Sequence, residues 1–151
     1  MKVLLVLCLA IAACVGVLVS IRVGQGDAKS LGVITRSLHA RATTYVQIDN
    51  GKKGRSAGDL FTFTHSLTEH GSRVGRDQGY CLRILSGTSE CTMTSFLGDG
   101  RIMVVGSFDD AGVNHLAITG GTGVYAHARG SVTVHRAGFF QLDLIYALSL
   151  G

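Results

Sequence analysis

His65 is the residue of this sequence whose neighbours best suit it to chemistry. It alternates with Phe61 and Phe63, so an extended strand would present these three side chains on one face. An imidazole gains and loses a proton near neutral pH, which makes histidine a suitable acid–base group in an apolar site. A core histidine with a fully hydrogen-bonded ring would show the same pattern, and the sequence leaves both interpretations open.

The other short motifs indicate turns and loops rather than a site. None of the six histidines is spaced two or four residues from another ligand in a recognisable metal-binding pattern, so no metal site is predicted and no cofactor is implied. Gly121 and Gly123 superficially match a dinucleotide-binding fingerprint, but a strand rather than a helix is expected after them. Ser56 has the glycine spacing of a hydrolase nucleophile, yet it falls in a basic polar loop.

The elements that must position these side chains are β-strands, because apolar and polar residues alternate along most of the chain. In the stretch 116–134, Gly120, Gly121 and Gly123 are expected to form a tight corner between two strands. The expected strands are 39–48, 59–67, 80–85, 91–96, 101–108, 113–119, 131–136 and 139–150, with polar loops at 49–58 and 69–79.

Composition supports one all-β domain. The chain has 151 residues, 21 glycines and no proline, so glycine must supply the turns. No amphipathic helix separates the strands, which favours a barrel or a sandwich over a fold of alternating strands and helices. An eight-stranded barrel is just wide enough to be filled by side chains or to hold one small ligand. Positive charges are scattered, so a nucleic-acid partner is not indicated.

The N-terminal segment has the pattern of an export signal. Residues 3–21 are almost wholly apolar and lie between Lys2 and Arg22. A cleaved signal peptide, an uncleaved membrane anchor and lipid attachment at Cys14 all fit this pattern. The protein is therefore expected to be secreted or extracytoplasmic, with the option of membrane anchoring. The expected organisation is a signal peptide or anchor over 1–23, a linker over 24–38 and a β-barrel domain over 39–151.

Two cysteines remain beyond the leader, Cys81 and Cys91. An exported chain meets an oxidising compartment, where an even pair of cysteines is usually bridged. Both lie near the start of strand-like runs that are joined by a short polar turn. A cross-strand disulfide is therefore predicted, and two free buried thiols are the alternative.

Taken together, several stretches resemble the barrels of allene oxide cyclases and dirigent proteins, over most of residues 45–151. The resemblance implies an eight-stranded antiparallel β-barrel with an apolar cavity, often assembled as a homodimer or homotrimer. Plant cyclases of this family close an unstable fatty-acid epoxide to a cyclopentenone, and dirigent proteins steer the coupling of phenolic intermediates. The stretches that carry the resemblance are 58–60, 63–67, 74–75, 79–81, 116–125, 128–130 and 139–151.

The resemblance also suggests three polar candidates for catalysis. His65 stands where the plant cyclases have a cavity asparagine, and Arg129 matches the arginine of the dirigent Ala-Arg-Gly segment. Asp49 follows one or two residues after the position of a carboxylate on the first cyclase strand. Asp143, on the last strand, is expected either on the outer surface or as a buried acid. The residues expected to contact a ligand are Tyr45, Phe63 and Tyr125.

Two functions follow from these observations. One is an exported barrel that binds a small hydrophobic molecule, fatty-acid-derived or phenolic, and catalyses its cyclisation or isomerisation without a cofactor. The other is a non-enzymatic carrier or structural surface barrel. Two polar groups that converge on one apolar pocket would favour the enzyme. A cavity lined only by apolar and small residues would favour the carrier.

Overall fold

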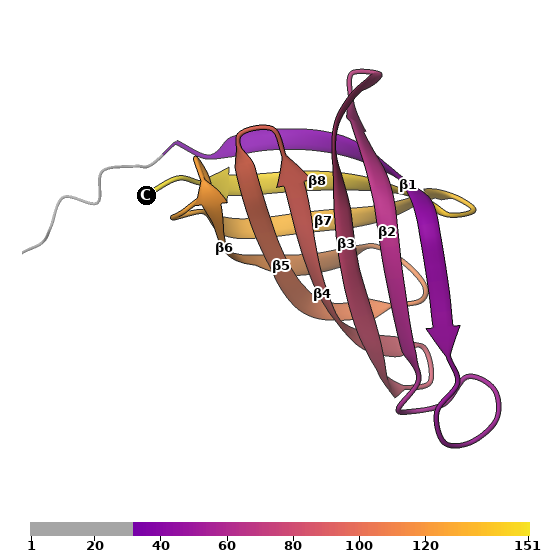
Figure 1. Cartoon of the computed structure of the whole chain (residues 1–151). Helices are drawn as coiled ribbons and strands as arrows, with labels where there is room; N and C mark the ends of the chain where they lie inside the picture. The colour runs from indigo at the N-terminus through magenta and orange to yellow at the C-terminus, as the bar shows by residue number, and fades with distance from the viewer. Residues whose placement is uncertain (1–31) are drawn as a thin grey trace, which may run out of the picture.

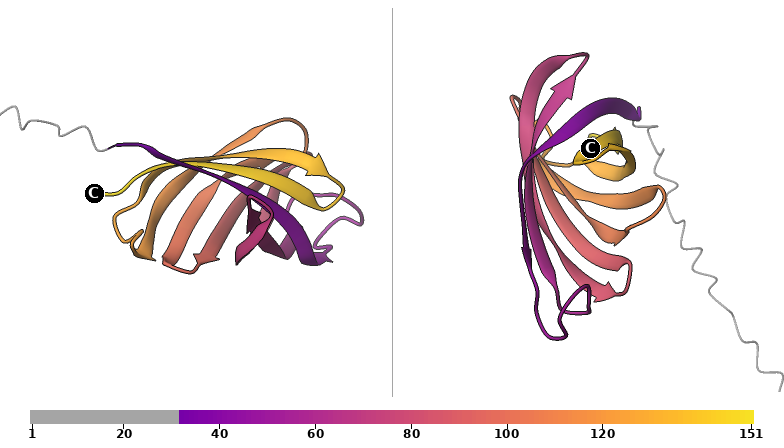
Figure 2. Two further views of the ribbon diagram at one scale, coloured as in Figure 1. Left: turned by 90° about the horizontal axis from the view of Figure 1, so that it is seen from above. Right: turned by 90° about the vertical axis from the view of Figure 1, so that its right-hand side faces the viewer.

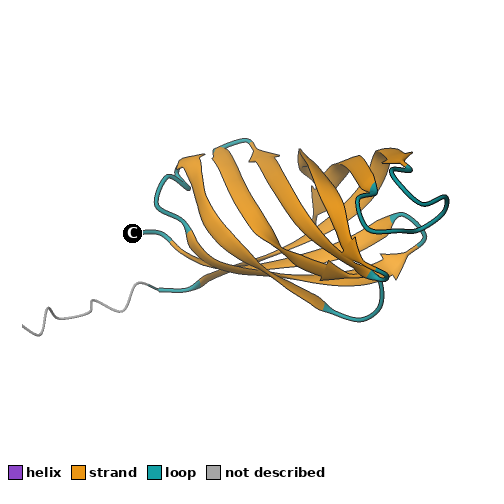
Figure 3. Cartoon of the chain, turned by 90° about the horizontal axis from the view of Figure 1, so that it is seen from below, coloured by secondary structure: helices purple, strands orange, loops and turns teal. Residues whose placement is uncertain are grey.

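The computed structural model describes residues 32–151, and this part of the chain is a single β-barrel (Figure 1). It contains strands and loops, and no described segment forms a helix suited to crossing a bilayer (Figure 3). The expected leader at 1–23 and most of the expected linker lie outside the described residues. The strands are β1 (Ile34–Ile48), β2 (Leu60–Glu69), β3 (Ser72–Leu85), β4 (Thr88–Leu97), β5 (Gly100–Asp109), β6 (Asn114–Gly123), β7 (Arg129–Gly138) and β8 (Gln141–Ser149).

The barrel is closed and entirely antiparallel, as the sequence predicted. Each strand pairs with the next along the chain, and β1 also pairs with β8, so the eight strands leave no free edge. In Figure 2, β1 (indigo) lies beside β8 (yellow) in both views. Connections between consecutive strands are short, except for the loop that joins β1 to β2.

Strict alternation of side chains builds the core. On β4, for example, Ser89, Cys91, Met93 and Ser95 are buried, while the intervening residues are more exposed. Bulky side chains from β2, β5, β7 and β8 form much of the remaining core. The largest fully buried ones are Tyr146, Leu67, Ile102, Leu144, Leu148, Val104 and Val132.

Several strand boundaries differ from the sequence-based expectation, and the differences are largest at β1, β3 and β6. β1 begins at Ile34 rather than at 39, because residues 34–41 pair with β8, so the end of the expected linker is barrel wall. β3 begins at Ser72, so most of the expected polar loop at 69–79 is strand, with its polar side chains mainly on the outer face. The predicted glycine corner is also wrong in position: Gly121 lies within β6, where a Cβ would overlap the backbone oxygen of Arg101.

The two ends of the barrel carry different groups of loops. The C-terminus and the start of β1 lie at one end (Figure 1). The other end, here called the mouth, carries the four connections at 49–59, 86–87, 110–113 and 139–140. β3 and β7 run in the same direction, and both end at the mouth. Arg83 near the end of β3 and Arg136 near the end of β7 therefore both lie there.

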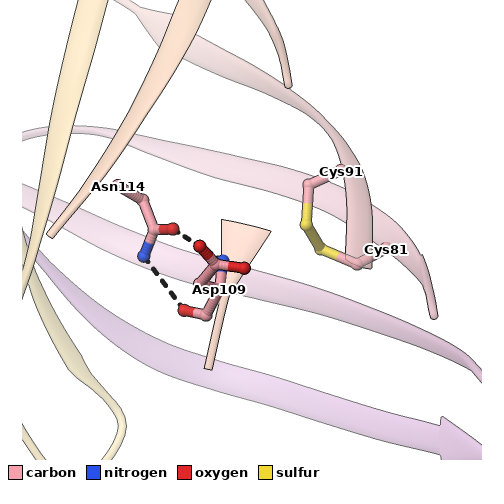
Figure 4. Close-up of a disulfide and its surroundings, with 4 residues drawn as sticks. All are labelled: Cys81, Cys91, Asp109 and Asn114. Atoms are coloured by element: carbon pink, nitrogen blue, oxygen red, sulfur yellow. Dashed lines mark hydrogen bonds between the residues drawn. A yellow bond between two sulfur atoms is a disulfide. The ribbon is translucent and has the colours of Figure 1, made fainter. Parts of the chain in front are cut away.

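The predicted disulfide is confirmed. Cys81 on β3 and Cys91 on β4 are direct register partners, both point inward, and they form a disulfide (Figure 4). A disulfide is compatible with an extracellular location. Nearby, the side-chain amide of Asn114 accepts a hydrogen bond from the backbone N–H of Asp109 (2.6 Å) and donates one to the backbone carbonyl of Asp109 (3.1 Å) (Figure 4). These two hydrogen bonds hold the ends of the β5–β6 connection together.

Candidate functional site

The barrel encloses a cavity of about 380 Å³ that opens at the mouth. This volume is in the range that holds a small organic ligand. The wall is predominantly apolar, and it includes both cysteines of the disulfide. Its apolar and aromatic lining residues are Ala42, Tyr45, Phe61, Phe63, Met93, Phe108, Leu116, Val134, Phe139, Phe140, Leu142 and Leu144.

A histidine–aspartate pair is built into this wall. His65 on β2 and Asp77 on β3 are register partners, and both fall on the inward-facing positions of their strands. His65 Nδ1 lies 2.6 Å from Asp77 Oδ1. The histidine is 7% exposed and the aspartate is 0% exposed, so water scarcely reaches the pair. The second oxygen of Asp77, Oδ2, has no hydrogen-bond partner among the described residues.

This pairing leaves one ring nitrogen of His65 for a ligand. The carboxylate of Asp77 is an acceptor, so it favours the tautomer in which His65 carries its proton on Nδ1. Nε2 then has a free lone pair, makes no hydrogen bond to the described residues, and belongs to a ring that lines the cavity. The arrangement can accept a proton from a bound molecule, and the buried carboxylate would stabilise the imidazolium that forms.

Aromatic packing holds the histidine ring in place. The Phe63 and His65 rings lie 5.0 Å apart between centroids, on the same face of β2. Phe63 lies opposite Gly79 on β3, and a Cβ added to Gly79 would lie 2.7 Å from Cζ of the phenylalanine ring. The absence of a side chain at this position therefore allows Phe63 to lie against the β3 backbone, where it also limits the movement of His65.

A second buried polar pair continues this polar row. Ser95 on β4 is the register partner of Asp77, and its Oγ lies 2.6 Å from the hydroxyl of Tyr146 on β8. Both side chains are fully buried. Burial raises the pKa of Tyr146 strongly, and the negative charge of Asp77 adds to this effect. The tyrosine therefore remains a neutral phenol, and it can serve as a hydrogen-bond donor within the core.

The mouth carries the charged side chains of the cavity. Asp110 Oδ2 accepts a hydrogen bond from Arg83 Nη1 at 3.1 Å and forms an ion pair with Arg55 Nη2 at 3.2 Å. Arg136 also lines the mouth, with its guanidinium 5.9 Å from the centre of the Phe108 ring. The Tyr45 and Phe140 rings, 5.9 Å apart, lie at the same opening.

Of the sequence-predicted residues, three line the cavity: His65, Phe63 and Tyr45. Asp49 does not, because it follows the end of β1 and its exposed carboxylate accepts a hydrogen bond from the backbone N–H of Gly54 (3.0 Å) within the β1–β2 loop. Arg129 is exposed at the start of β7, at the end of the barrel opposite the mouth, and donates to the carbonyl of Ala128.

Tyr125 and Asp143 also lie away from the cavity. Tyr125 is buried near the opposite end, where its hydroxyl accepts a hydrogen bond from Arg36 (2.6 Å) and donates one to Asp99 (3.0 Å). Asp143 is on the outer surface, paired with His39 at 2.8 Å, as one of its two interpretations anticipated. The structure thus brings His65, Phe63 and Tyr45 together, and separates Asp49, Arg129 and Tyr125 from them.

Sequence reasoning missed the three residues that add most to this site: Asp77, Arg83 and Arg136. A signal for two of them was present. Counting back and forward from Cys81 in steps of two places Asp77, Gly79 and Arg83 on the inward face of one strand. The polar character of residues 69–79 hid the strand, and so it hid the partner of His65.

Comparison with known proteins places the fold. No family model matches the chain, and no curated protein matches it either. Among solved structures, a pyocyanin demethylase is 28% identical with a TM-score of 0.73, over 77% of this chain and 100% of that one. An exo-specific intermolecular Diels–Alderase (14%, TM-score 0.67) covers 78% and 96% of the two chains. A pterocarpan synthase dirigent protein (18%, TM-score 0.61) covers 79% and 94%.

The chain has the dirigent-type barrel fold. At these identities the likeness to the dirigent protein and to the Diels–Alderase concerns the fold alone. The fold implied by the sequence resemblance is therefore confirmed, and the neighbouring barrels include cyclising enzymes.

Proposed function

We propose that this barrel binds a small, mostly apolar molecule in its cavity and catalyses its cyclisation or isomerisation, with His65 transferring the proton. The observation that carries the proposal is the His65–Asp77 pair in the wall of an apolar cavity. A buried carboxylate beside a histidine is costly to maintain in a core. A site that must move a proton explains why the histidine of this pair lines the cavity, where a ligand can reach it.

The proposed chemistry is an internal proton transfer. His65 Nε2 removes a proton from an acidic C–H or O–H group of the bound molecule, and the electron pair left behind shifts through the conjugated system of that molecule. The Asp77 carboxylate stabilises the imidazolium, which then returns its proton to a second atom of the same molecule. Atoms and electrons balance without a co-reactant, because the product is an isomer of the substrate.

The cavity itself contributes by confinement. An apolar wall excludes water from a reactive intermediate, and a close-fitting wall holds a flexible chain in the folded conformation that ring closure needs. The names of the neighbouring barrels support this reading. One is named as a Diels–Alderase and one as a pterocarpan synthase dirigent protein, whereas the pyocyanin demethylase is named for a different reaction.

Native mass spectrometry of the gently purified protein, followed by solvent extraction, tests binding. A co-purifying apolar molecule of a size that fits the cavity is expected. A clean apo mass, together with no uptake of added fatty acids or phenolics, would contradict the proposal.

Turnover of the identified molecule then tests the role of His65. His65→Gln and Asp77→Asn should keep binding and lose about 100-fold or more in rate, as expected for loss of a positioned acid–base group. His115→Gln is the matched control, because His115 is exposed and its ring hydrogen-bonds to the Thr133 hydroxyl at 3.1 Å. Binding without turnover in the native protein would identify a carrier.

A further inference from the structure

The charged groups at the mouth are unbalanced, and this imbalance indicates what kind of molecule enters. Three guanidinium groups line the cavity, those of Arg55, Arg83 and Arg136, against the single carboxylate of Asp110. Both Arg55 and Arg83 contact the same oxygen of Asp110. Among the groups that line the cavity, one negative charge is therefore shared between two positive charges, and a third positive charge lies across the same opening.

Arg83 is the most informative of the three. It is 3% exposed, it lines the cavity from β3, and its buried Nε has no hydrogen-bond partner among the described residues. A buried guanidinium with unmet hydrogen-bonding capacity is unfavourable, and a bidentate anion is the group that best satisfies it. Asp59 is near enough to Arg83 for the arginine to contribute to its lowered pKa. Its oxygens, however, are already bonded to Asn50 and Ser56.

Arg136 faces Arg83 from the other side of the barrel. It continues the inward-facing series of Val132 and Val134 on β7, four strands away from β3 around the closed sheet. Within residues 32–151 it has no ion pair, and its guanidinium lies over the Phe108 ring. A guanidinium at this distance from a ring keeps its N–H donors available at the rim.

We infer that the mouth is an anion subsite, in which Arg83 and Arg136 bind an ionised acidic group of the ligand, such as a carboxylate, phenolate or sulfonate. The inference rests on the proposed function, because it assumes that the ligand occupies the cavity. It narrows the substrate class from hydrophobic molecules in general to apolar acids, bound with the acidic group at the mouth and the reacting atom near His65.

The fold also sets the length of such a ligand. Asp77 and Arg83 are six residues apart on β3, a separation of about 20 Å along a strand, or about 15 Å along the axis of a tilted barrel. Both His65 and Arg83 extend into the cavity, so the acidic group and the reacting atom are on the order of 10 Å apart. A fused-ring aromatic acid or a medium-length fatty-acid derivative has these dimensions.

Two fluorescent probes that differ in one group test the inference. Anilinonaphthalene sulfonate carries an anion, and phenylnaphthylamine has the same rings without the sulfonate. Fluorescence titration of the full chain should show at least tenfold tighter binding of the sulfonate. Arg83→Gln and Arg136→Gln should each weaken sulfonate binding about tenfold and leave phenylnaphthylamine within about twofold. If Arg83→Gln fails to fold, Arg136→Gln still tests the inference.

Arg73→Gln is the matched control, because Arg73 is exposed on β3 at the end of the barrel away from the mouth. Arg73→Gln should change the affinity for neither the sulfonate nor phenylnaphthylamine. Arg83 is nearly inaccessible from outside, so adventitious surface binding of the sulfonate cannot respond to Arg83→Gln. Equal affinity for the two probes, or sulfonate binding that ignores both arginine variants, overturns the anion subsite and leaves the cavity proposal standing. Binding of neither probe overturns both.

Discussion

The buried contact between Ser95 and Tyr146 offers a quantitative test of how the core beneath the site is held. The two hydroxyls are 2.6 Å apart, and both side chains are fully buried. Removing one hydroxyl leaves the other without a partner in a place that water does not reach. Removing both leaves no unpaired polar group. The single and double substitutions should therefore not be additive.

The expected magnitudes follow from the cost of an unpaired buried polar group. Tyr146→Phe and Ser95→Ala should each lower the free energy of unfolding by about 2 kcal/mol, within a usual range of about 1–3. The double variant should also lose about 2 kcal/mol rather than about 4, which is a coupling energy of about 2 kcal/mol. For a domain of about 120 residues, 2 kcal/mol corresponds to a fall in Tm of roughly 8 °C.

Urea denaturation followed by circular dichroism, with the disulfide intact in all four proteins, measures these energies. The slope of unfolding free energy against urea should stay the same across the set, so that midpoints report stability alone. Additive losses in the double variant would refute the reasoning, because they would mean that each side chain is stabilised by packing and not by their shared hydrogen bond. A Tyr146→Phe variant as stable as the native protein would refute it equally.

Three further predictions concern the scaffold. Removing the disulfide as Cys81→Ala/Cys91→Ala should lower the free energy of unfolding by about 3 kcal/mol, because the bridge restricts the conformations of the unfolded chain. Urea denaturation without reductant measures this loss. Arg36 lowers the pKa of Glu69, so this ion pair stabilises the fold above the usual glutamate pKa and is lost as pH falls through the lowered one. The difference in stability between the native protein and Glu69→Gln should therefore narrow as the pH falls from neutral through the usual glutamate pKa and below it. Gly79→Ala should cost about 3 kcal/mol by overpacking, measured as the shift in urea midpoint.

A matched control separates the steric cause from general damage. Gly98→Ala adds a Cβ into open space, so it should change stability by no more than about 0.5 kcal/mol. An equal loss at Gly98 and Gly79 would contradict the steric explanation. A pH-independent difference in stability for Glu69→Gln would contradict its linkage to Arg36. Unchanged stability without the disulfide would contradict the chain-entropy argument.

Local pattern was enough to predict the class of fold and one wall of the site. Alternation correctly placed Phe61, Phe63 and His65 on one face, since the direction of side chains along a strand is a local property. It also put both cysteines in neighbouring strands joined by a short turn, where a cross-strand bridge is geometrically simple. The sequence by itself thus determined an all-β chain, the inward face of β2 and the disulfide.

The partners of His65 were decided only by the closed barrel. Asp77 lies beside it because the register of β2 against β3 matches these residues, and register depends on pairing along both whole strands. Asp49 and Arg129 have suitable chemistry, but closure leaves one beyond the end of its strand and the other at the far end of the barrel. Arg83 and Arg136 both line the cavity at the mouth, from strands four apart. Residues distant in sequence converge only when the sheet closes, because no local pattern records which positions of different strands will share the cavity.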